Sequence, residues 1–212
     1  MEAEMNLLKR EIHEMWTLVY KQIFRAGEAV LTLDKNIAQQ IMISERRVNV
    51  YELKIDNDVE DVLAMCNPVA IDLRFVLAIS KINTNLERIA DFAEGIARFI
   101  NKYPEPGLDS ELIKDLRLSE MIEEVKSMLL KTQEAFEKEN TEIEILDKTV
   151  NEILADYIKK NPDSALSCLY LVGVFRKFER AGDHISNIAE EIVFSVDAKV
   201  LKHSKSIEEE QK

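Results

Sequence analysis

Two pairs of acidic residues at helical spacing have the clearest capacity for chemistry in this sequence. Glu87 and Asp91 are four positions apart, and so are Glu179 and Asp183. Four residues make about one helical turn, so each pair places two carboxylates on one face of a helix. Carboxylate oxygens favour hard cations such as Fe³⁺, Mn²⁺, Mg²⁺ and Ca²⁺ over zinc or copper. The spacing indicates a cation site wherever further oxygen donors face the same side chains.

Matching oxygen-rich stripes occur upstream of each acidic pair. In the first half the stripe has spacings of four, three and four residues, and it consists of Glu45, Asn49, Glu52 and Asp56. In the second half it consists of Glu144, Asp147 and Asn151. If each stripe helix packs beside the helix with the acidic pair, two oxygen-rich faces meet in one groove. Neither stripe contributes a thiolate or an imidazole, which favours a hard metal ion.

A plainer interpretation stays open beside this one. A single acidic pair on an exposed helix is usually a solvated face, and Arg88 and Arg180 can form surface ion pairs of little energetic value with the neighbouring glutamates. The duplication in matched context favours metal binding more than a single pair would, and both interpretations stay open. Like charges four residues apart also repel slightly, and a cation would relieve that cost.

The chain as a whole is duplicated. Asn67-Pro68 recurs as Asn161-Pro162, and the five residues from Glu87 to Asp91 recur between Glu179 and Asp183. The segment Tyr103-Pro104-Glu105-Pro106-Gly107 separates the two halves. Hydrophobic periodicity and capping patterns predict six helices, at about residues 3–31, 37–63, 68–102, 109–139, 141–160 and 162–200. Asp34 is expected to cap or kink the first junction.

These elements predict an all-α fold of two tandem, homologous three-helix bundles. The first bundle is expected to span 1–103 and the second 108–200, followed by a charged, frayed tail over 201–212. With only 5 Gly and 4 Pro in 212 residues, long helices are the expected building blocks.

Composition excludes several classes of function. The 28 Lys and Arg against 40 Asp and Glu give a net charge of −12, which disfavours binding to nucleic acid or to an anionic membrane. No run of apolar residues is long enough to span a bilayer, and the charged N-terminal segment does not resemble a signal peptide. Cys66 and Cys168 fit unbridged thiols in a reducing compartment. We therefore expect a cytoplasmic protein.

Nothing in the sequence favours an enzyme. It contains neither a glycine-rich phosphate loop nor a recognisable nucleophile motif, and the missing Glu-x-x-His pattern disfavours a ferritin-like di-iron oxidase. His184 is expected to lie on the helix surface or to contact another helix rather than to bind a metal, and Trp16 to lie in the core or at a helix interface. Asp72 and Arg74 fit either a local ion pair or a contact with a partner.

Three segments resemble the PhoU family of phosphate-signalling proteins. Residues 67–74, with the sequence NPVAIDLR, are similar to that family's QPVASDLR segment. Residues 86–91 (LERIAD) and 178–190 (FERAGDHISNIAE) resemble its duplicated LERIGDHAxNIAE motif. The likeness extends over about residues 5–200. In the first copy Ala90, Phe92 and Gly95 replace the motif's Gly, His and Asn, and the second copy lacks an Asp-Leu-Arg segment.

The resemblance implies a cytoplasmic, non-enzymatic regulator of phosphate uptake that binds metal ions, above all iron in a multinuclear cluster. The implied ligands of the first bundle are Glu87, Asp91, Glu45 and Asn49, extended by Glu52 and Asp56. Those of the second bundle are Glu179, Asp183, Asp147 and Asn151. Asn49 and Asn151 stand where the family pattern has Asp, so they would bring a carbonyl oxygen without a charge.

The implied partners are a phosphate sensor histidine kinase, which the protein would restrain, and the ATPase of the phosphate ABC transporter. A homodimer is left open. The alternatives are a metal-storage or redox protein built on a helical bundle, a scaffold whose acidic stripes only confer solubility, and an accessory protein of another phosphate permease.

Overall fold

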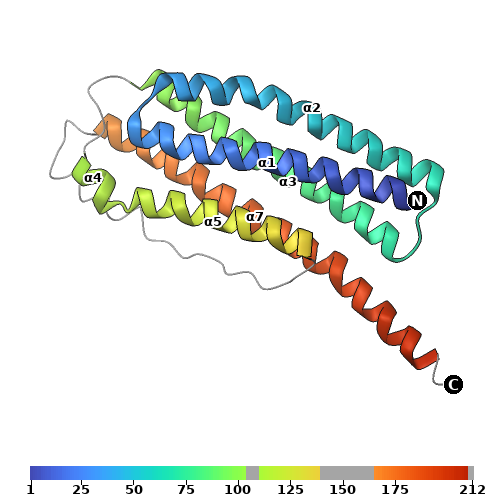
Figure 1. Cartoon of the computed structure of the whole chain (residues 1–212). Helices are drawn as coiled ribbons and strands as arrows, with labels where there is room; N and C mark the ends of the chain where they lie inside the picture. The colour runs from blue at the N-terminus through green and yellow to red at the C-terminus, as the bar shows by residue number, and fades with distance from the viewer. Residues whose placement is uncertain (104–109, 139–164, 210–212) are drawn as a thin grey trace.

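The computed structural model describes residues 1–103, 110–138 and 165–209, all of which form helices or the short turns between them (Figure 1). The helices are α1 (Glu2–Thr32), α2 (Lys35–Cys66), α3 (Ile71–Lys102), α4 (Ser110–Asp115), α5 (Leu118–Lys138) and α7 (Ala165–Glu209). The all-α prediction is confirmed. The helix expected at 141–160 lies outside the described residues.

The first bundle consists of α1, α2 and α3, which run side by side along the length of the molecule (Figure 1). Its apolar stripes recur every three or four residues, as in Ile12, Trp16, Val19 and Ile23 of α1, and all four of these side chains are fully buried. Asp34 caps the junction between α1 and α2, as predicted. Its carboxylate accepts hydrogen bonds from the backbone amides of Asn36 and Ile37 at the start of α2.

The junction between α2 and α3 differs from the prediction. Asn67 was expected to cap the start of α3, with Pro68 as its first helical residue. Instead Asn67 has a left-handed backbone (φ 46°) and ends α2, and α3 begins three residues after Pro68, at Ile71. Asparagine tolerates this conformation better than most residues, and proline often follows a helix end, so the same dipeptide also fits a C-terminal stop.

The second half departs from the prediction at two places. The helix expected at 109–139 is divided into α4 and α5, because Arg117 has a left-handed backbone (φ 52°) that interrupts the helix. The last helix was expected to end near Val200, yet α7 continues to Glu209, so the segment predicted to be frayed is helical for most of its length. In Figure 1 this end of α7 projects away from the rest of the molecule.

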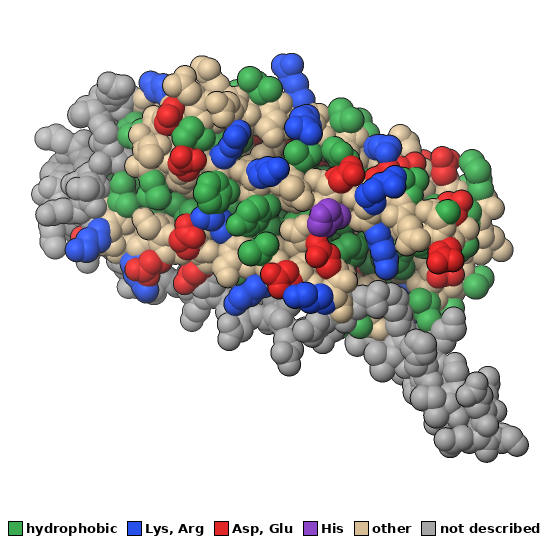
Figure 2. All heavy atoms as spheres, viewed as in Figure 1, with side chains coloured by type: hydrophobic (Ala, Val, Ile, Leu, Met, Phe, Trp, Pro, Cys, Tyr) green, Lys and Arg blue, Asp and Glu red, His purple; other side chains and the backbone are tan. Residues whose placement is uncertain are grey.

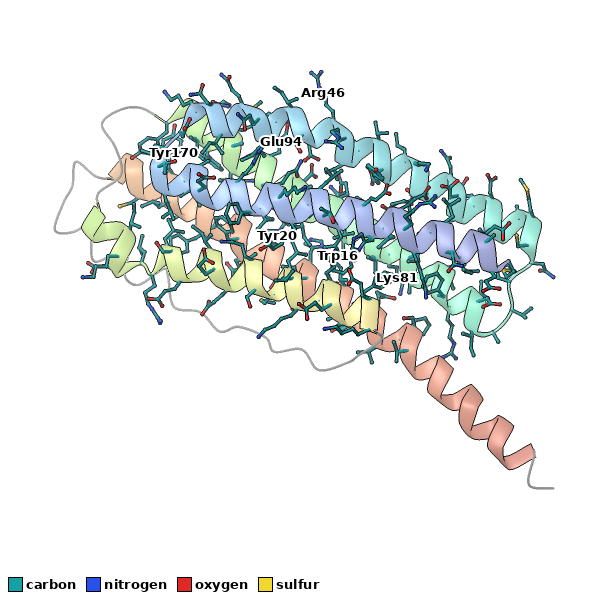
Figure 3. All side chains as sticks on the ribbon, viewed as in Figure 1. Trp16, Tyr20, Arg46, Lys81, Glu94 and Tyr170 are labelled. Carbon is teal, nitrogen blue, oxygen red and sulfur yellow. The ribbon has the colours of Figure 1, made fainter. Side chains whose placement is uncertain are left out.

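The two halves share one hydrophobic core. Buried side chains from α1, α2, α3, α5 and α7 form a continuous cluster. Trp16 of α1 is fully buried between α1 and α5 (Figure 3). Its indole Nε1 donates a hydrogen bond of 3.2 Å to the carbonyl oxygen of Leu129 in α5. Its predicted core position is confirmed. None of the described helices is apolar over a stretch long enough to cross a membrane.

The contact between the halves is centred on an antiparallel pair of helices, α3 and α7. Lys81 near the start of α3 forms an ion pair of 2.8 Å with Glu191 of α7, whereas Tyr103 at the end of α3 packs against Tyr170 near the start of α7. These two helices carry the acidic pairs predicted to bind metal. The fold therefore positions both motifs on its central helix pair.

Candidate metal-binding groove

Four predicted donors gather where α2 and α3 pack against each other. Glu45 and Glu52 come from α2, and Glu87 and Asp91 come from α3. Their charges act on one another: Asp91 and Glu87 both raise the pKa of Glu45, and Asp91 contributes to the raised pKa of Glu52. The predicted convergence of two carboxylate stripes is thus present in the first bundle, and we call this region the acidic groove.

Glu45 is the most deeply placed carboxylate in the acidic groove. Only 5% of the residue is exposed, and neither carboxylate oxygen has a hydrogen-bond partner within range among the described residues. Burial, together with the charges of Asp91, Glu94 and Glu87, raises the pKa of Glu45 to about 7. The amide of Gln22 lies near enough to oppose part of the shift, although it does not meet the geometry of a hydrogen bond. A buried carboxylate without a partner is costly, so this site favours either protonation or a cation.

Glu87 is in a similar electrostatic situation. Burial, followed by the charge of Asp91, raises the pKa of Glu87 to about 7. Arg88 lies against both acids of the pair, with its Nη1 3.1 Å from Asp91 Oδ2 and its Nε 3.5 Å from Glu87 Oε2. Arg88 is half exposed, so these ion pairs compensate only part of the charge. The surface ion pairs expected of Arg88 are therefore present, but Glu87 beside it is not an ordinary solvated group. Arg180, the other arginine of the plainer interpretation, lies over the ring of Phe92, 4.9 Å from its centre.

Glu94 also belongs to the acidic groove, although the sequence prediction omitted it from the metal ligands. It lies one further turn along the stripe of Glu87 and Asp91, beneath α2 (Figure 3), and it raises the pKa of Glu45. Its own carboxylate forms an ion pair of 2.8 Å with Arg98. The spacing of the stripe alone could have included it.

Asn49 and Asp56 are less available for a shared ion. Asn49 is exposed on α2. One oxygen of Asp56 accepts a hydrogen bond of 2.9 Å from Asn83, whose amide also donates to the carbonyl oxygen of Glu52. Asn83 is fully buried, and the sequence analysis did not identify it. It could have been recognised as a polar residue within the apolar stripe of α3. It fixes the register of α3 against α2.

Among the residues that the structure describes, no three acidic, histidine or cysteine side chains stand close enough together to hold an ion in this conformation. The acidic groove thus gathers oxygen donors along its length without presenting a closed set of ligands. Coordination would need side-chain rotations, and release of Glu87 and Asp91 from Arg88 is the first of them.

The second copy of the motif is only partly covered by the structure. Glu179 and Asp183 lie on α7, where Glu179 is half-buried and Asp183 is exposed. Asp147 and Asn151, their predicted companions, lie outside the described residues. A second groove stays a prediction.

Other predicted residues mediate contacts within the chain. His184 Nδ1 lies 2.7 Å from Asn85 Oδ1 of α3, which confirms the expected inter-helix contact. The guanidinium of Arg74 lies over the ring of Phe194 in α7, 5.3 Å from its centre. Asp72 is half-buried in the first turn of α3, where a negative charge favours the helix dipole. Among the residues that the structure describes, neither Asp72 nor Arg74 takes part in the local ion pair that was one alternative.

Comparison with known proteins identifies the duplicated unit. The family model described as "PhoU domain" matches residues 12–100 and again residues 118–192. A phosphate-specific transport system accessory protein PhoU homolog from Burkholderia is 30% identical, over 95% of this chain and 91% of its own. The homolog from Archaeoglobus fulgidus is 32% identical, over 91% of this chain and 93% of its own.

Two crystal structures have the same fold. PhoU from Pseudomonas aeruginosa superimposes with a TM-score of 0.85 at 28% sequence identity, covering 92% of this chain and 98% of the other. PhoU from Streptococcus pneumoniae gives a TM-score of 0.72 at 21% identity, and that likeness concerns the fold alone.

Proposed function

Because this chain belongs to the PhoU family, we propose that it regulates phosphate uptake and phosphate-starvation signalling as a metal-dependent adaptor. The family comprises accessory proteins of phosphate transport, which are regulatory and not enzymes. The finer parts of the proposal are the metal, the partners and the cytoplasmic location.

The observation that carries the metal proposal is the unpartnered carboxylate of Glu45. Its oxygens are buried beside three further acids, Glu87, Asp91 and Glu94, and the donor set contains only oxygen. Such a set fits a hard cation, with iron favoured by the family resemblance and Mn²⁺, Mg²⁺ or Ca²⁺ as chemical alternatives. Glu45, Glu87 and Asp91 would hold the ion, with Glu52 and Glu94 within the same field. When bound, it supplies positive charge where the fold has buried negative charge.

The residues of the acidic groove explain how occupancy could alter the surface. Arg88 pairs with Glu87 and Asp91 in the structure described, so ligation by these acids would release its guanidinium to solvent. Glu45 and Glu87 would be held as anions instead of being partly protonated. The side chains of the acidic groove come from both α2 and α3, so a bound ion that held them in place would make that helix pair more rigid. A kinase or transporter ATPase that contacts this surface would meet two different charge patterns.

We propose that the sensor histidine kinase and the ATPase of the phosphate ABC transporter are the partners, and that the adaptor restrains the kinase when phosphate is abundant. The support is the description of the relatives as accessory proteins of the phosphate-specific transport system. We propose that the chain acts in the cytoplasm, where both the ATPase and the kinase domain would be accessible to it.

Deletion and complementation test this function. Removal of the gene should derepress phosphate-starvation transcription at high phosphate, and the wild-type chain should restore repression. A double variant, Glu87→Gln with Asp91→Asn, should restore it poorly. Normal phosphate regulation in the deletion strain would contradict the proposal. A defect in transport through a different phosphate permease alone would support that alternative instead.

A further inference from the structure

The outer face of α2 carries an apolar stripe that no other part of the described chain covers. Ile43, Val50 and Leu53 have exposed fractions of 69%, 64% and 63%. They lie on the side of α2 opposite the buried residues Ile41 and Val48. Isolated exposed apolar residues are ordinary, but three on one helix face form a patch that can serve as a contact site.

The stripe is bordered by positive charge. Arg46 and Arg47 are both exposed, and Figure 3 shows Arg46 pointing away from α2 into solvent. Within the described part of the chain, no carboxylate lies at ion-pair distance from either guanidinium, whereas Arg88 and Arg98 on α3 are both paired with acids. Figure 2 shows basic and apolar side chains sharing the upper edge of the molecule, where α2 lies.

The charge of this face is unusual for the chain. No exposed residue from Lys35 to Lys54 is acidic, although the sequence has 40 Asp and Glu among 212 residues. The acids of this segment, Glu45 and Glu52, point into the acidic groove instead. Beyond Lys54 the exposed residues become acidic, with Glu60 and Asp61. The face therefore has a defined extent of about five helical turns.

The spacing of the apolar residues favours a helix as the occupant. Val50 follows Ile43 by seven positions and Leu53 follows Val50 by three, which is the a, a, d pattern of a two-helix seam. Arg46 lies within this seam, and Arg47 occupies a flanking position that in helix pairs commonly faces an opposite charge. An anionic membrane surface would bind the positive charge of Arg46 and Arg47 alone and would not require the heptad spacing of the apolar residues.

We propose that the face formed by Ile43, Arg46, Arg47, Val50 and Leu53 docks an acidic amphipathic helix of a partner protein. The apolar residues of that helix pack on Ile43, Val50 and Leu53, and its carboxylates pair with Arg46 and Arg47. The proposal goes beyond the function proposed above, since it requires neither bound metal nor phosphate. It also places the docked helix on the element that forms one wall of the acidic groove.

The test uses the full chain and a fluorescent peptide of about three heptads, with Leu and Ile at the core positions and Glu at the flanking ones. Binding is measured by anisotropy at low salt. We expect Arg46→Glu and Arg47→Glu each to weaken binding by roughly tenfold, and Val50→Ser to weaken it by about fivefold. Arg176→Glu on the exposed side of α7 makes the same charge change and should have no effect. All four positions are exposed, and circular dichroism verifies that each variant is folded.

A charge-swapped peptide, with Lys in place of Glu, provides the decisive comparison. It should bind the Arg46→Glu variant better than the wild-type chain. The proposal is overturned if the acidic peptide fails to bind, or if Arg176→Glu weakens binding as much as Arg46→Glu. It is also overturned if vesicles containing phosphatidylglycerol bind this face while the peptide does not. Self-association that Val50→Ser abolishes would show that a second copy is the occupant. None of these results depends on phosphate regulation, so the two proposals can fail separately.

Discussion

The two helices that carry the acidic motif, α3 and α7, pack directly against each other, and equivalent positions of the two helices hold different residues. Glu179 follows Glu87 by 92 positions, and by the same offset His184 is equivalent to Phe92. The rings of Phe92 and His184 contact each other, with centroids 5.5 Å apart. The antiparallel α3–α7 pair therefore has approximate two-fold symmetry, with these two rings near its axis.

Away from that axis the symmetry is broken by chemistry. Gly95 of α3 makes room for the Lys177 side chain of α7, because a Cβ at Gly95 would collide with Lys177 Nζ. At the equivalent contact, Asn187 of α7 lies against Asn85 of α3, with 3.4 Å between the amide nitrogen and oxygen. The second copy thus contributes more polar groups to the seam, whereas the first copy directs its acids toward α2. A duplicated sequence predicts a duplicated backbone, but the neighbours decide whether a motif becomes a site.

The largest expected effect concerns whether the two bundles are energetically separate. Trp16→Ala should destabilise the protein by about 3–5 kcal/mol, since it removes a fully buried indole and its hydrogen bond to Leu129. Urea unfolding followed by circular dichroism should show one cooperative transition at a lower midpoint. Two transitions, of which only one moves, would show that the bundles unfold independently and that the shared core couples them weakly.

A second variant tests the effect of the buried Glu45 carboxylate of the first copy on stability. The pKa of Glu45 is raised from 4.5 to about 7 in the fold, so metal-free protein should lose stability as the pH rises between these values. Glu45→Gln should remove the part of that loss due to Glu45, leaving the part due to Glu87, and stabilise the chelator-treated protein above pH 7 by roughly 2–3 kcal/mol. At pH 4 the two proteins should be nearly equal. Asp183→Asn, an exposed change in the second copy, is the control and should alter stability by less than about 0.5 kcal/mol. A parallel pH dependence for Glu45→Gln and the wild type would contradict this account of the acidic groove.

The buried amide of Asn83 also distinguishes the two copies, and its removal is expected to have a smaller effect on the free energy of unfolding. Phe175 is the equivalent residue of the second copy, so only the first copy uses a polar side chain here. Asn83→Ala should cost about 1–3 kcal/mol, because it leaves Asp56 and the Glu52 carbonyl oxygen without their buried donor. Thermal unfolding measures the cost. A neutral substitution would mean that water replaces the amide without loss.

The smallest effect is expected at the surface of the seam. Lys81 is 61% exposed, and its ion pair with Glu191 should contribute only about 0.2–1 kcal/mol. A double-mutant cycle with Lys81→Ala and Glu191→Ala measures the coupling, which should shrink further at high salt. A salt-independent coupling above 1 kcal/mol would show that this pair holds α3 and α7 together more strongly than its exposure suggests.

Much of the fold could be predicted from periodicity. The spans of α1, α2 and α3 agree with the apolar stripes to within a few residues, and the duplication of two motifs predicted the repeated unit that the family model matches. The errors lie at helix ends. Asn67-Pro68 fits a helix start and a helix stop equally well, and the left-handed turn at Arg117 carries neither glycine nor proline to mark it.

The site could be predicted only in part. Spacing predicted that Glu45, Glu52, Glu87 and Asp91 would meet, because residues four apart share a helix face. Spacing contains no information on burial, so it could not separate the deeply placed Glu45 from the exposed Asn49. Nor could it show that Arg88 would lie against the acidic pair, or that Lys177 of α7 would come within the field of Asp91. These features depend on contacts between residues far apart in the sequence.

Metal content tests the central claim most directly. Elemental analysis should compare the wild-type chain, purified without chelator or affinity-tag metal, with Glu87→Gln/Asp91→Asn and with Glu179→Gln/Asp183→Asn. The account predicts that the wild type retains iron or another hard metal, and that the first pair of substitutions removes the share held by the acidic groove without loss of helix content. Negligible metal in the wild type, or equal metal in the wild type and the Glu87→Gln/Asp91→Asn variant, would contradict it.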